Sequence, residues 1–331
     1  MSAAASGDDE VVKLLLTYGN VNPNITDDDG RTPLLWAAMK SHYGVVRLLL
    51  GCEDVNPNIP DNYRRSPLIW AATSGDDGVV KLLLRCRKVN PNITDDGGRT
   101  PLWWAAEGGH FGVVQLLLER EDVNPNIPED GGITALLWAA GQGRDEVVKL
   151  LLKCQKVDPN TSVWDDRTAL LCAALRGNSG AVQLLLERED INPNIPDKYG
   201  HTPLSWAAGL GLEEVVKLLL KCQKVDPNII GGWGGTALFH AAFGGHSGVV
   251  QQLLGREDVN PNIPDSCGRT PIWRAARAGH DEVVQLLLAR EDVNPNMPGN
   301  TCRTLLWWAS RILKRAVNLL QARQTANPNT V

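Results

Sequence analysis

Apolar residues recur at helical spacing in short segments along the chain, and glycine or proline separates each segment from the next. After Thr100, the positions Leu102, Ala105 and Ala106 predict one short amphipathic helix. A second short helix is predicted by the apolar positions Val113, Val114, Leu117 and Leu118. The pattern therefore predicts two short helices that follow one another closely.

Start and stop signals surround this helix pair. Thr100 caps free amides of the first helix, and Pro101 suits its first turn because proline there loses no hydrogen bond. The glycine pair at 108–109 ends the first helix, Pro125 prevents continuation of the second, and Thr94–Arg99 predicts a turn. Neither helix is long enough to be stable alone, so the unit can bury its apolar face only against copies of itself.

The chain contains such copies at a fixed period. The tripeptide Thr-Pro-Leu or a close variant recurs every 34 residues, beginning at Thr32, Ser66, Thr100, Thr134, Thr168, Thr202, Thr236, Thr270 and Thr304. An Asn-Pro-Asn or Asp-Pro-Asn marker accompanies most copies. The segments Glu146–Asn160 and Glu214–Asn228 are identical and lie 68 residues apart, which indicates that the chain grew by copying pairs of repeats.

The repeat resembles the ankyrin repeat. The sequence of Gly98–His110, GRTPLWWAAEGGH, carries the resemblance, and Val113–Leu118 and Asp122–Asn124 fit it. The resemblance implies an all-α ankyrin-repeat solenoid of paired antiparallel helices with hairpin-like turns. The Trp-Ala-Ala and Val-Asn-Pro-Asn sequences are similar to those in the ankyrin arrays of filamentous fungi. One departure is that the usual histidine after Thr-Pro-Leu is replaced, by Leu35, Ile69 and Trp103 in the first three copies.

The period also predicts the domain organisation. We expect one ankyrin-repeat array over 1–331, with an N-terminal half repeat at 1–25, eight repeats at 26–298 and a C-terminal capping repeat at 299–331. The capping assignment rests on the polar residues Lys314, Arg311, Arg315 and Arg323.

Composition excludes several classes of protein. The longest apolar run, Ala169–Leu175, is far shorter than the ~20 residues of a membrane span, so no membrane association is expected. Basic residues are scattered and the net charge is −5, which gives no footprint for nucleic acid. The N-terminus does not resemble a secretory signal, and seven cysteines then indicate a reducing compartment. We expect an intracellular, cytoplasmic protein, with a nuclear location left open.

No motif for catalysis or cofactor binding is present. The chain lacks HExxH, GxSxG and GxxxxGK[ST] sequences, and the glycine-rich stretch Gly231–Gly235 lacks the lysine of a phosphate-binding loop. We therefore expect no enzyme activity, no cofactor and no metal.

Four residue types recur in register. Tryptophan stands four residues after the repeat Thr or Ser at six copies, which predicts core packing. The column comprises Trp36, Trp70, Trp104, Trp138, Trp206 and Trp308, and is interrupted by Cys172, His240 and Arg274. Cysteines share another position and predict free structural thiols, because neighbouring repeats are too far apart for a disulfide; they are Cys52, Cys86, Cys154 and Cys222. The resemblance implies that His42, His110, His246 and His280 bond to backbone and order a loop. It also implies that the first Asn of each Asn-Pro-Asn links neighbouring hairpins.

The positions that differ between repeats predict the binding site, because the stack does not dictate them. They are the two residues at each turn tip and the two after each Ala-Ala pair. By resemblance, these positions line a concave face where ankyrin arrays bind partners. We expect large or charged residues there to bind the partner: Tyr63, Trp164, Leu175, Arg176, Lys198, Tyr199, Leu210, Trp233 and Phe243. Local packing by Trp164 and Trp233 is the alternative.

The function expected is non-catalytic recognition of a protein or peptide by a monomeric scaffold or adaptor, through the concave face. Two alternatives stay open. The chain could be the ligand-sensing array of a larger fungal NACHT–ankyrin signalling protein, which the half-repeat start favours. It could also be a stand-alone regulator associated with a biosynthetic gene cluster.

Overall fold

The computed structural model describes residues 1–18, 21–163, 165–231 and 234–295 of the 331-residue chain. Within these ranges it contains α-helices and no β-strand, in agreement with the all-α fold expected from the sequence. The chain divides into two compact units, unit 1 over Met1–Trp164 and unit 2 over Asp165–Val331. Each unit is described by itself.

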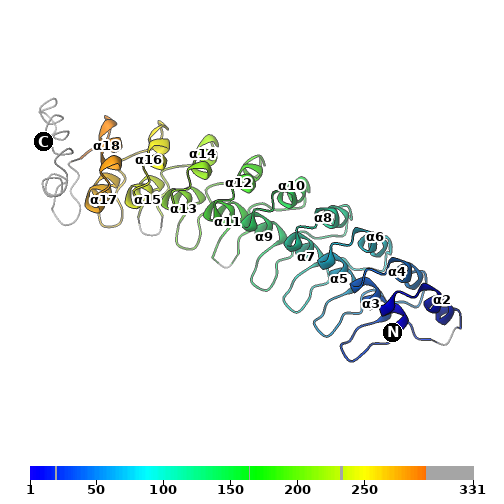
Figure 1. Ribbon diagram of the computed structural model, residues 1–331. Helices are drawn as coiled ribbons and strands as arrows, with labels where there is room; N and C mark the ends of the chain where they lie inside the picture. Colours follow the sequence, from blue (N-terminus) through cyan, green and yellow to red (C-terminus); the bar gives the residue numbers. More distant parts are fainter. Residues whose placement is uncertain (19–20, 164, 232–233, 296–331) are drawn as a thin grey trace, which may run out of the picture. The chain divides into compact units, whose positions relative to one another are not determined.

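Unit 1 contains five pairs of antiparallel helices (Figure 1). The odd-numbered helices, called inner helices, are α1 (Ser2–Ser6), α3 (Pro33–Met39), α5 (Pro67–Ser74), α7 (Pro101–Gly108) and α9 (Ala135–Gln142). The even-numbered helices, called outer helices, are α2 (Asp9–Thr17), α4 (Tyr43–Leu50), α6 (Asp77–Arg85), α8 (Phe111–Leu118) and α10 (Asp145–Lys153).

Unit 2 repeats the same arrangement over its described residues. Its inner helices are α11 (Ala169–Arg176), α13 (Pro203–Gly209), α15 (Ala237–Gly244) and α17 (Pro271–Ala278). Its outer helices are α12 (Ser179–Leu186), α14 (Glu213–Lys221), α16 (Ser247–Leu254) and α18 (Asp281–Ala289). The capping repeat expected at 299–331 lies outside the described residues.

The inner helices begin and end as their sequences predict. The hydroxyl of Thr100 accepts a hydrogen bond from the amide of Trp103 at 3.1 Å, and Pro101 occupies the first turn. Gly109 follows the helix in the left-handed conformation with φ 71°, which a glycine adopts without a Cβ penalty. Ser41 takes the equivalent position after α3 with φ 59°.

The core of each unit lies between the two helix layers. The alanine pair of each inner helix from α3 onward is buried, as Ala105 and Ala106 illustrate, and so are Val113, Val114 and Leu117 of the outer helix. Inner helices pack on the next inner helices and outer helices on the next outer ones within each unit. The small alanines allow this close approach, so each repeat completes the core of its neighbour.

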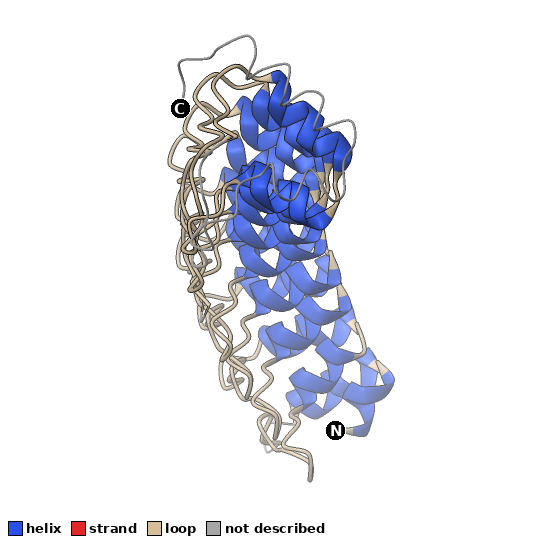
Figure 2. Ribbon diagram, turned by 90° about the vertical axis from the view of Figure 1, so that its left-hand side faces the viewer, coloured by secondary structure: helices blue, strands red, loops and turns tan. Residues whose placement is uncertain are grey.

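The turns before the inner helices form hairpin-like loops that lie along one side of the helices (Figure 2). In the loop at Asp61, the Asp61 amide donates to the carbonyl of Arg65 at 3.0 Å. The neighbouring loop is attached through the Asn62 amide, which donates to the carbonyl of Asp29 at 2.9 Å. Neighbouring loops are therefore joined by their backbones as well as by the helices beneath them.

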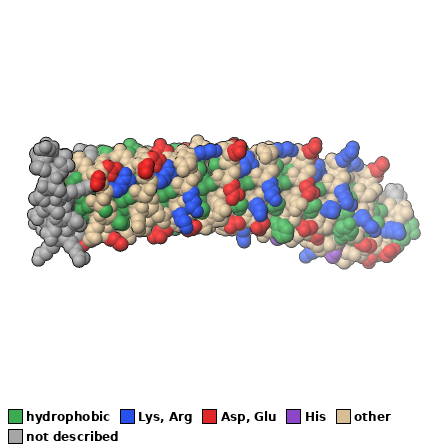
Figure 3. Space-filling view, turned by 90° about the horizontal axis from the view of Figure 1, so that it is seen from above, with side chains coloured by type: hydrophobic (Ala, Val, Ile, Leu, Met, Phe, Trp, Pro, Cys, Tyr) green, Lys and Arg blue, Asp and Glu red, His purple; other side chains and the backbone are tan. Residues whose placement is uncertain are grey.

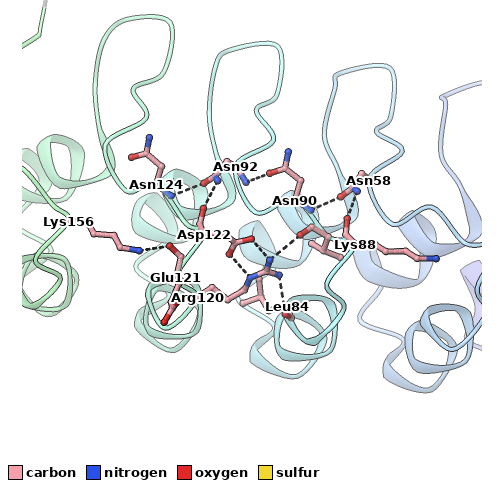
Figure 4. A network of polar contacts seen from close by, with 11 residues as sticks. Asn58, Leu84, Lys88, Asn90, Asn92, Arg120, Glu121, Asp122, Asn124 and Lys156 are labelled. Carbon is pink, nitrogen blue, oxygen red and sulfur yellow. Dashed lines mark hydrogen bonds and ion pairs between the residues drawn. The ribbon is translucent and has the colours of Figure 1, made fainter.

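Asparagine side chains also join successive repeats. They belong to the second Asn of each marker, whereas the first had been expected. The first Asn of the marker, Asn90, turns inward on its own loop, where its Oδ1 accepts from the amide of Asn92 at 3.0 Å. The second, Asn92, reaches the next repeat (Figure 4). Its Nδ2 donates to the carbonyl of Asp122 at 2.7 Å, and its Oδ1 accepts from the amide of Asn124 at 2.8 Å. The expectation that the side chain of the first Asn links the hairpins was wrong, because the first Asn contributes only its backbone amide to the link.

In unit 1, the 68-residue period corresponds to an alternation of arginine and lysine contacts between neighbouring repeats. Repeats that end in Arg-Glu-Asp hold the preceding repeat with a guanidinium: Arg120 donates to the carbonyls of Leu84 and Val89 and pairs with Asp122. Repeats that end in Lys-Val use an ammonium instead, and Lys156 donates to the carbonyl of Glu121 (Figure 4). Both side chains satisfy carbonyls near the end of an outer helix of the preceding repeat.

The tryptophan column does not belong to the core, contrary to expectation. Trp36, Trp70, Trp104, Trp138 and Trp206 are half-buried. Among the tryptophans that the structure describes, the fully buried ones are Trp103 and Trp273, which stand one position earlier in their repeats. An indole carries an N–H that needs a partner, and in four of the five half-buried residues it donates to a carboxylate on the hairpin loop.

The cysteine column consists of half-buried free thiols. Cys52, Cys86, Cys154 and Cys222 follow the outer helices and form no disulfide among the described residues. Cys52 and Cys86 line the same cleft near the ends of α4 and α6.

Candidate interaction surface

The candidate partner-binding residue of unit 1 lies at the tip of a hairpin loop. The side chain of Tyr63 is 60% exposed. The guanidinium of Arg65 stacks over both the Tyr63 ring, at 4.8 Å from its centroid, and the Trp70 ring, at 4.0 Å. Tyr63 is thus an exposed aromatic ring that a cation holds against the loop.

Three candidates of unit 2 lie at or just after the C-terminal ends of successive inner helices. Leu175 in α11 is half-buried, whereas Leu210 and Phe243 are 48% and 51% exposed. Leu210 follows α13, and Phe243 lies in the last turn of α15, which packs between α13 and α17. Arg176 ends α11 and is exposed. Apolar side chains therefore face solvent on consecutive helices.

Lys198 and Tyr199 lie at the tip of one hairpin loop of unit 2, and Lys198 pairs with an acidic residue. Lys198 forms an ion pair of 2.5 Å with Asp165, and its ammonium lies 5.0 Å from the ring centroid of the 47%-exposed Tyr199. The hydrogen bond to Asp165 raises the pKa of Lys198, and a hydrogen bond to Tyr199 adds to this. The ammonium of Lys198 therefore already has an anionic partner within the protein. Trp164 and Trp233 lie outside the described residues.

Histidine side chains support the ends of the inner helices, as the resemblance implied. Nε2 of His280 lies 3.0 Å from the carbonyl of Phe243, and Nε2 of His246 lies 3.0 Å from that of Gly209. The same contact joins His110 to the carbonyl of Thr73 and His42 to that of Ala5, at 3.1 Å each. Each histidine therefore holds the carbonyl of a residue at one of the variable positions.

Sequence reasoning passed over Arg274, which the structure places beside Phe243. Arg274 lies in α17 at the position that tryptophan occupies in other repeats. Its guanidinium is 4.1 Å from the ring centroid of Phe243 and 5.4 Å from that of Phe239. Burial lowers the pKa of Arg274 below its ordinary value, and the nearby Arg269 and Arg277 lower it further. The break in the tryptophan column was the signal that could have identified it.

Both signs of charge are present on the outer face, which the outer helices form. There, Lys and Arg side chains lie beside Asp and Glu side chains (Figure 3). Ion pairs follow the outer helices of unit 2, including Arg256 with Asp258 at 2.5 Å and Arg290 with Asp292 at 2.6 Å. These basic residues already have anionic partners.

The described residues contain no cluster of three or more His, Cys, Asp or Glu side chains that could hold a metal ion. They also include no helix that is both long and apolar enough to cross a membrane.

Comparison with known proteins identifies the family. A family model for ankyrin repeats in three copies matches residues 1–95, 78–163, 155–231 and 223–298, which together exceed half of the chain. The search of curated proteins finds no match. Among solved structures, the ankyrin repeat domain of Bcl-3, described as a unique member of the IkappaB protein family, is 27% identical. It covers 69% of this chain and 100% of its own, with a TM-score of 0.62.

Ankyrin repeats are generally protein–protein interaction modules and typically non-catalytic. Because 524 solved chains match, the fold alone does not distinguish one partner from another. The periodic sequence, the paired helices and the family match agree, and the chain belongs to the ankyrin-repeat family.

Proposed function

We propose that this protein is a non-catalytic scaffold or adaptor that binds a protein partner through the hairpin loops and inner helices of unit 2, the inner face. The observation that carries the proposal is the exposure of Leu210 and Phe243 on neighbouring inner helices. Large exposed apolar side chains that are close together mark interaction sites more often than isolated ones do.

The energetics of interfaces support the same assignment. Aromatic side chains are enriched among residues that dominate binding energy, and truncation of such a residue costs about 2 kcal/mol or more. Phe243 is held by the stacked Arg274 and by the His280 contact to its carbonyl. A pre-positioned ring loses little conformational freedom on binding, which favours affinity.

The free thiols support an intracellular location for this activity. Six cysteines among the described residues are unpaired, and unpaired cysteines persist where the compartment is reducing.

Selection of peptides on the intact chain tests the proposal. A phage library of random 16-residue peptides is selected on the immobilised full-length protein and on a variant with Leu210→Ser and Phe243→Ser. The control variant carries Leu186→Ser and Leu218→Ser, which change half-buried leucines of the outer helices α12 and α14. We expect the inner-face variant to lose enrichment and the control to keep it, provided that circular dichroism shows both to be folded. Equal enrichment on all three proteins would overturn the proposal.

A further inference from the structure

The inner helices of unit 2 carry positive charge only. Their sequences are ALLCAALR, PLSWAAG, ALFHAAFG and PIWRAARA, with no aspartate or glutamate. Their arginines are Arg176, Arg274 and Arg277. In unit 1, by contrast, the inner helix α7 contains Glu107. The positive sign of these helices is not a consequence of the net charge of the chain, which is −5.

The carboxylate of Asp265, on the hairpin loop before α17, already has hydrogen-bond partners on both oxygens. Asp265 is buried, and its Oδ2 lies 2.6 Å from Nη2 and 2.7 Å from Nε of Arg269. Its Oδ1 accepts from the amides of Cys267 and Arg269 at 2.9 and 2.8 Å. Asp265 therefore has no capacity left to pair closely with a second guanidinium.

Arg274 has no anionic partner among the described residues. It is half-buried and makes no hydrogen bond or ion pair to the described residues, and its Nε is buried without a partner. The rings of Phe239 and Phe243 contact the guanidinium. Cation–π contact stabilises a guanidinium but leaves its N–H donors unsatisfied, and a partly desolvated cation without an anion is unfavourable.

We propose that Arg274 is the carboxylate-binding residue of the inner face, and that the partner is an acidic peptide segment with apolar side chains beside its Asp or Glu. The proposal rests on the function proposed above and specifies its partner. Arg274 suits this role because its planar fork matches a carboxylate with two hydrogen bonds. Phe243 beside it provides an apolar surface for a neighbouring side chain of the peptide.

The helix spacing sets the pattern of that peptide. Three successive inner helices provide the contact residues: Leu210 follows α13, Phe243 lies in α15 and Arg274 lies in α17. Packed helices are about 8–10 Å apart. An extended chain advances about 3.3 Å per residue, so one helix spacing corresponds to roughly three residues. We therefore expect two apolar residues about three residues apart, one for Leu210 and one for Phe243. The acidic residue should lie close to the second of them, because the guanidinium of Arg274 is only 4.1 Å from the centroid of the Phe243 ring.

The same peptide library tests this inference through the composition of the peptides recovered. On the wild-type full-length protein, we expect enriched peptides to have an excess of Asp and Glu over Lys and Arg. A synthetic peptide with the enriched sequence should bind the Arg274→Gln variant about tenfold more weakly, because the carboxylate loses its cation. The Arg274→Lys variant should regain part of the affinity, since it restores the charge without the planar fork.

Lys221→Gln is the matched control, because it removes one positive charge from the exposed end of the outer helix α14. Its affinity for the peptide should change less than twofold. An equal loss in this control would show a bulk charge effect and overturn the inference. Enriched peptides without an acidic excess, which still depend on Leu210 and Phe243, would overturn the inference but leave the proposed function standing. The inference would also be overturned if the wild-type protein bound a fluorescein-labelled oligothymidine as tightly as the peptide, because the arginine would then accept any polyanion.

Discussion

The indole nitrogen of Trp36 donates a hydrogen bond of 2.7 Å to Oδ2 of Asp27, nine residues earlier in the same repeat. Oδ1 of Asp27 accepts from the amides of Asp29 and Arg31 within the hairpin. One carboxylate therefore folds the hairpin and fastens it to the inner helix. The same bond recurs between Trp70 and Asp61 at 3.0 Å, Trp104 and Asp95 at 3.0 Å, and Trp206 and Asp197 at 2.9 Å.

Trp70→Phe should destabilise the protein more than Trp138→Phe does. Both substitutions replace a half-buried indole of the same column, but only Trp70 donates to a buried aspartate. Hydrogen bonds to charged groups contribute about 1.5–3 kcal/mol, so the free energy of unfolding should differ by roughly this amount. Urea unfolding followed by circular dichroism measures it. Equal losses in the two variants would show that the bond contributes nothing.

Much of this fold could be predicted from the residues themselves. The threonine caps and the glycine stops follow from local residue types at known positions, and the histidine contacts follow from the resemblance to ankyrin repeats. The role of the tryptophan column was misread, because spacing reveals which residues share a face but not where an N–H finds its acceptor. Arg274 was missed for a related reason: its missing partner and its stacking on Phe243 are evident only in three dimensions.

The repeat that begins at Thr168 should exchange its amide hydrogens fastest. It has Cys172 in the tryptophan column and Ala169 in place of the first-turn proline. Asp166 adopts the left-handed conformation with φ 57°, where Gly200 stands in the next repeat. A residue with a Cβ is strained there, so Asp166→Gly should stabilise the protein by about 0.5–1 kcal/mol.

Hydrogen exchange read by mass spectrometry should locate the fastest exchange in residues 165–174, and Asp166→Gly should slow it. The reverse change, Gly200→Asp, is the control and should speed exchange in its own repeat. Uniform protection along the described helices would contradict the expectation.

His240 should make the protein less stable as the pH falls. Burial lowers the pKa of His240 to about 4; His201 and Arg274 lower it too, while a backbone hydrogen bond with Gly235 acts in the opposite direction. In the unfolded chain the imidazole keeps its ordinary value of 6.5. The unfolded chain therefore binds more protons between these values. The contribution is fully present above pH 6.5 and is lost as the pH falls towards 4.

Between pH 7.5 and pH 5 the expected loss from His240 is about 2 kcal/mol, since each unit of pKa difference corresponds to about 1.4 kcal/mol. Urea unfolding at the two pH values measures it. His240→Gln should remove this part of the pH dependence. An unchanged dependence in that variant would refute the assignment to His240.

Replacement by aspartate should affect the stability of the protein at only one of the two asparagines of a marker. Asn90 uses only its Oδ1, as an acceptor for the amide of Asn92, and a carboxylate can do the same. Two repeats already have aspartate at the first position, Asp158 and Asp226, whereas the second position is asparagine in every copy. Asn90→Asp should therefore change the free energy of unfolding by less than about 0.5 kcal/mol, as a surface substitution does.

Asn92→Asp removes the donor that reaches the carbonyl of Asp122 in the next repeat, at 2.7 Å. It also places a negative charge beside that carbonyl oxygen, so we expect a loss of about 1–3 kcal/mol. Because the lost bond joins two repeats rather than closing a turn, the urea transition should also become broader, as neighbouring repeats unfold more independently. Asn92→Ala separates the two effects, since it removes the donor without adding charge. Similar stability of the Asn90→Asp and Asn92→Asp variants, with equally steep transitions, would mean that the asparagine ladder does not couple the repeats.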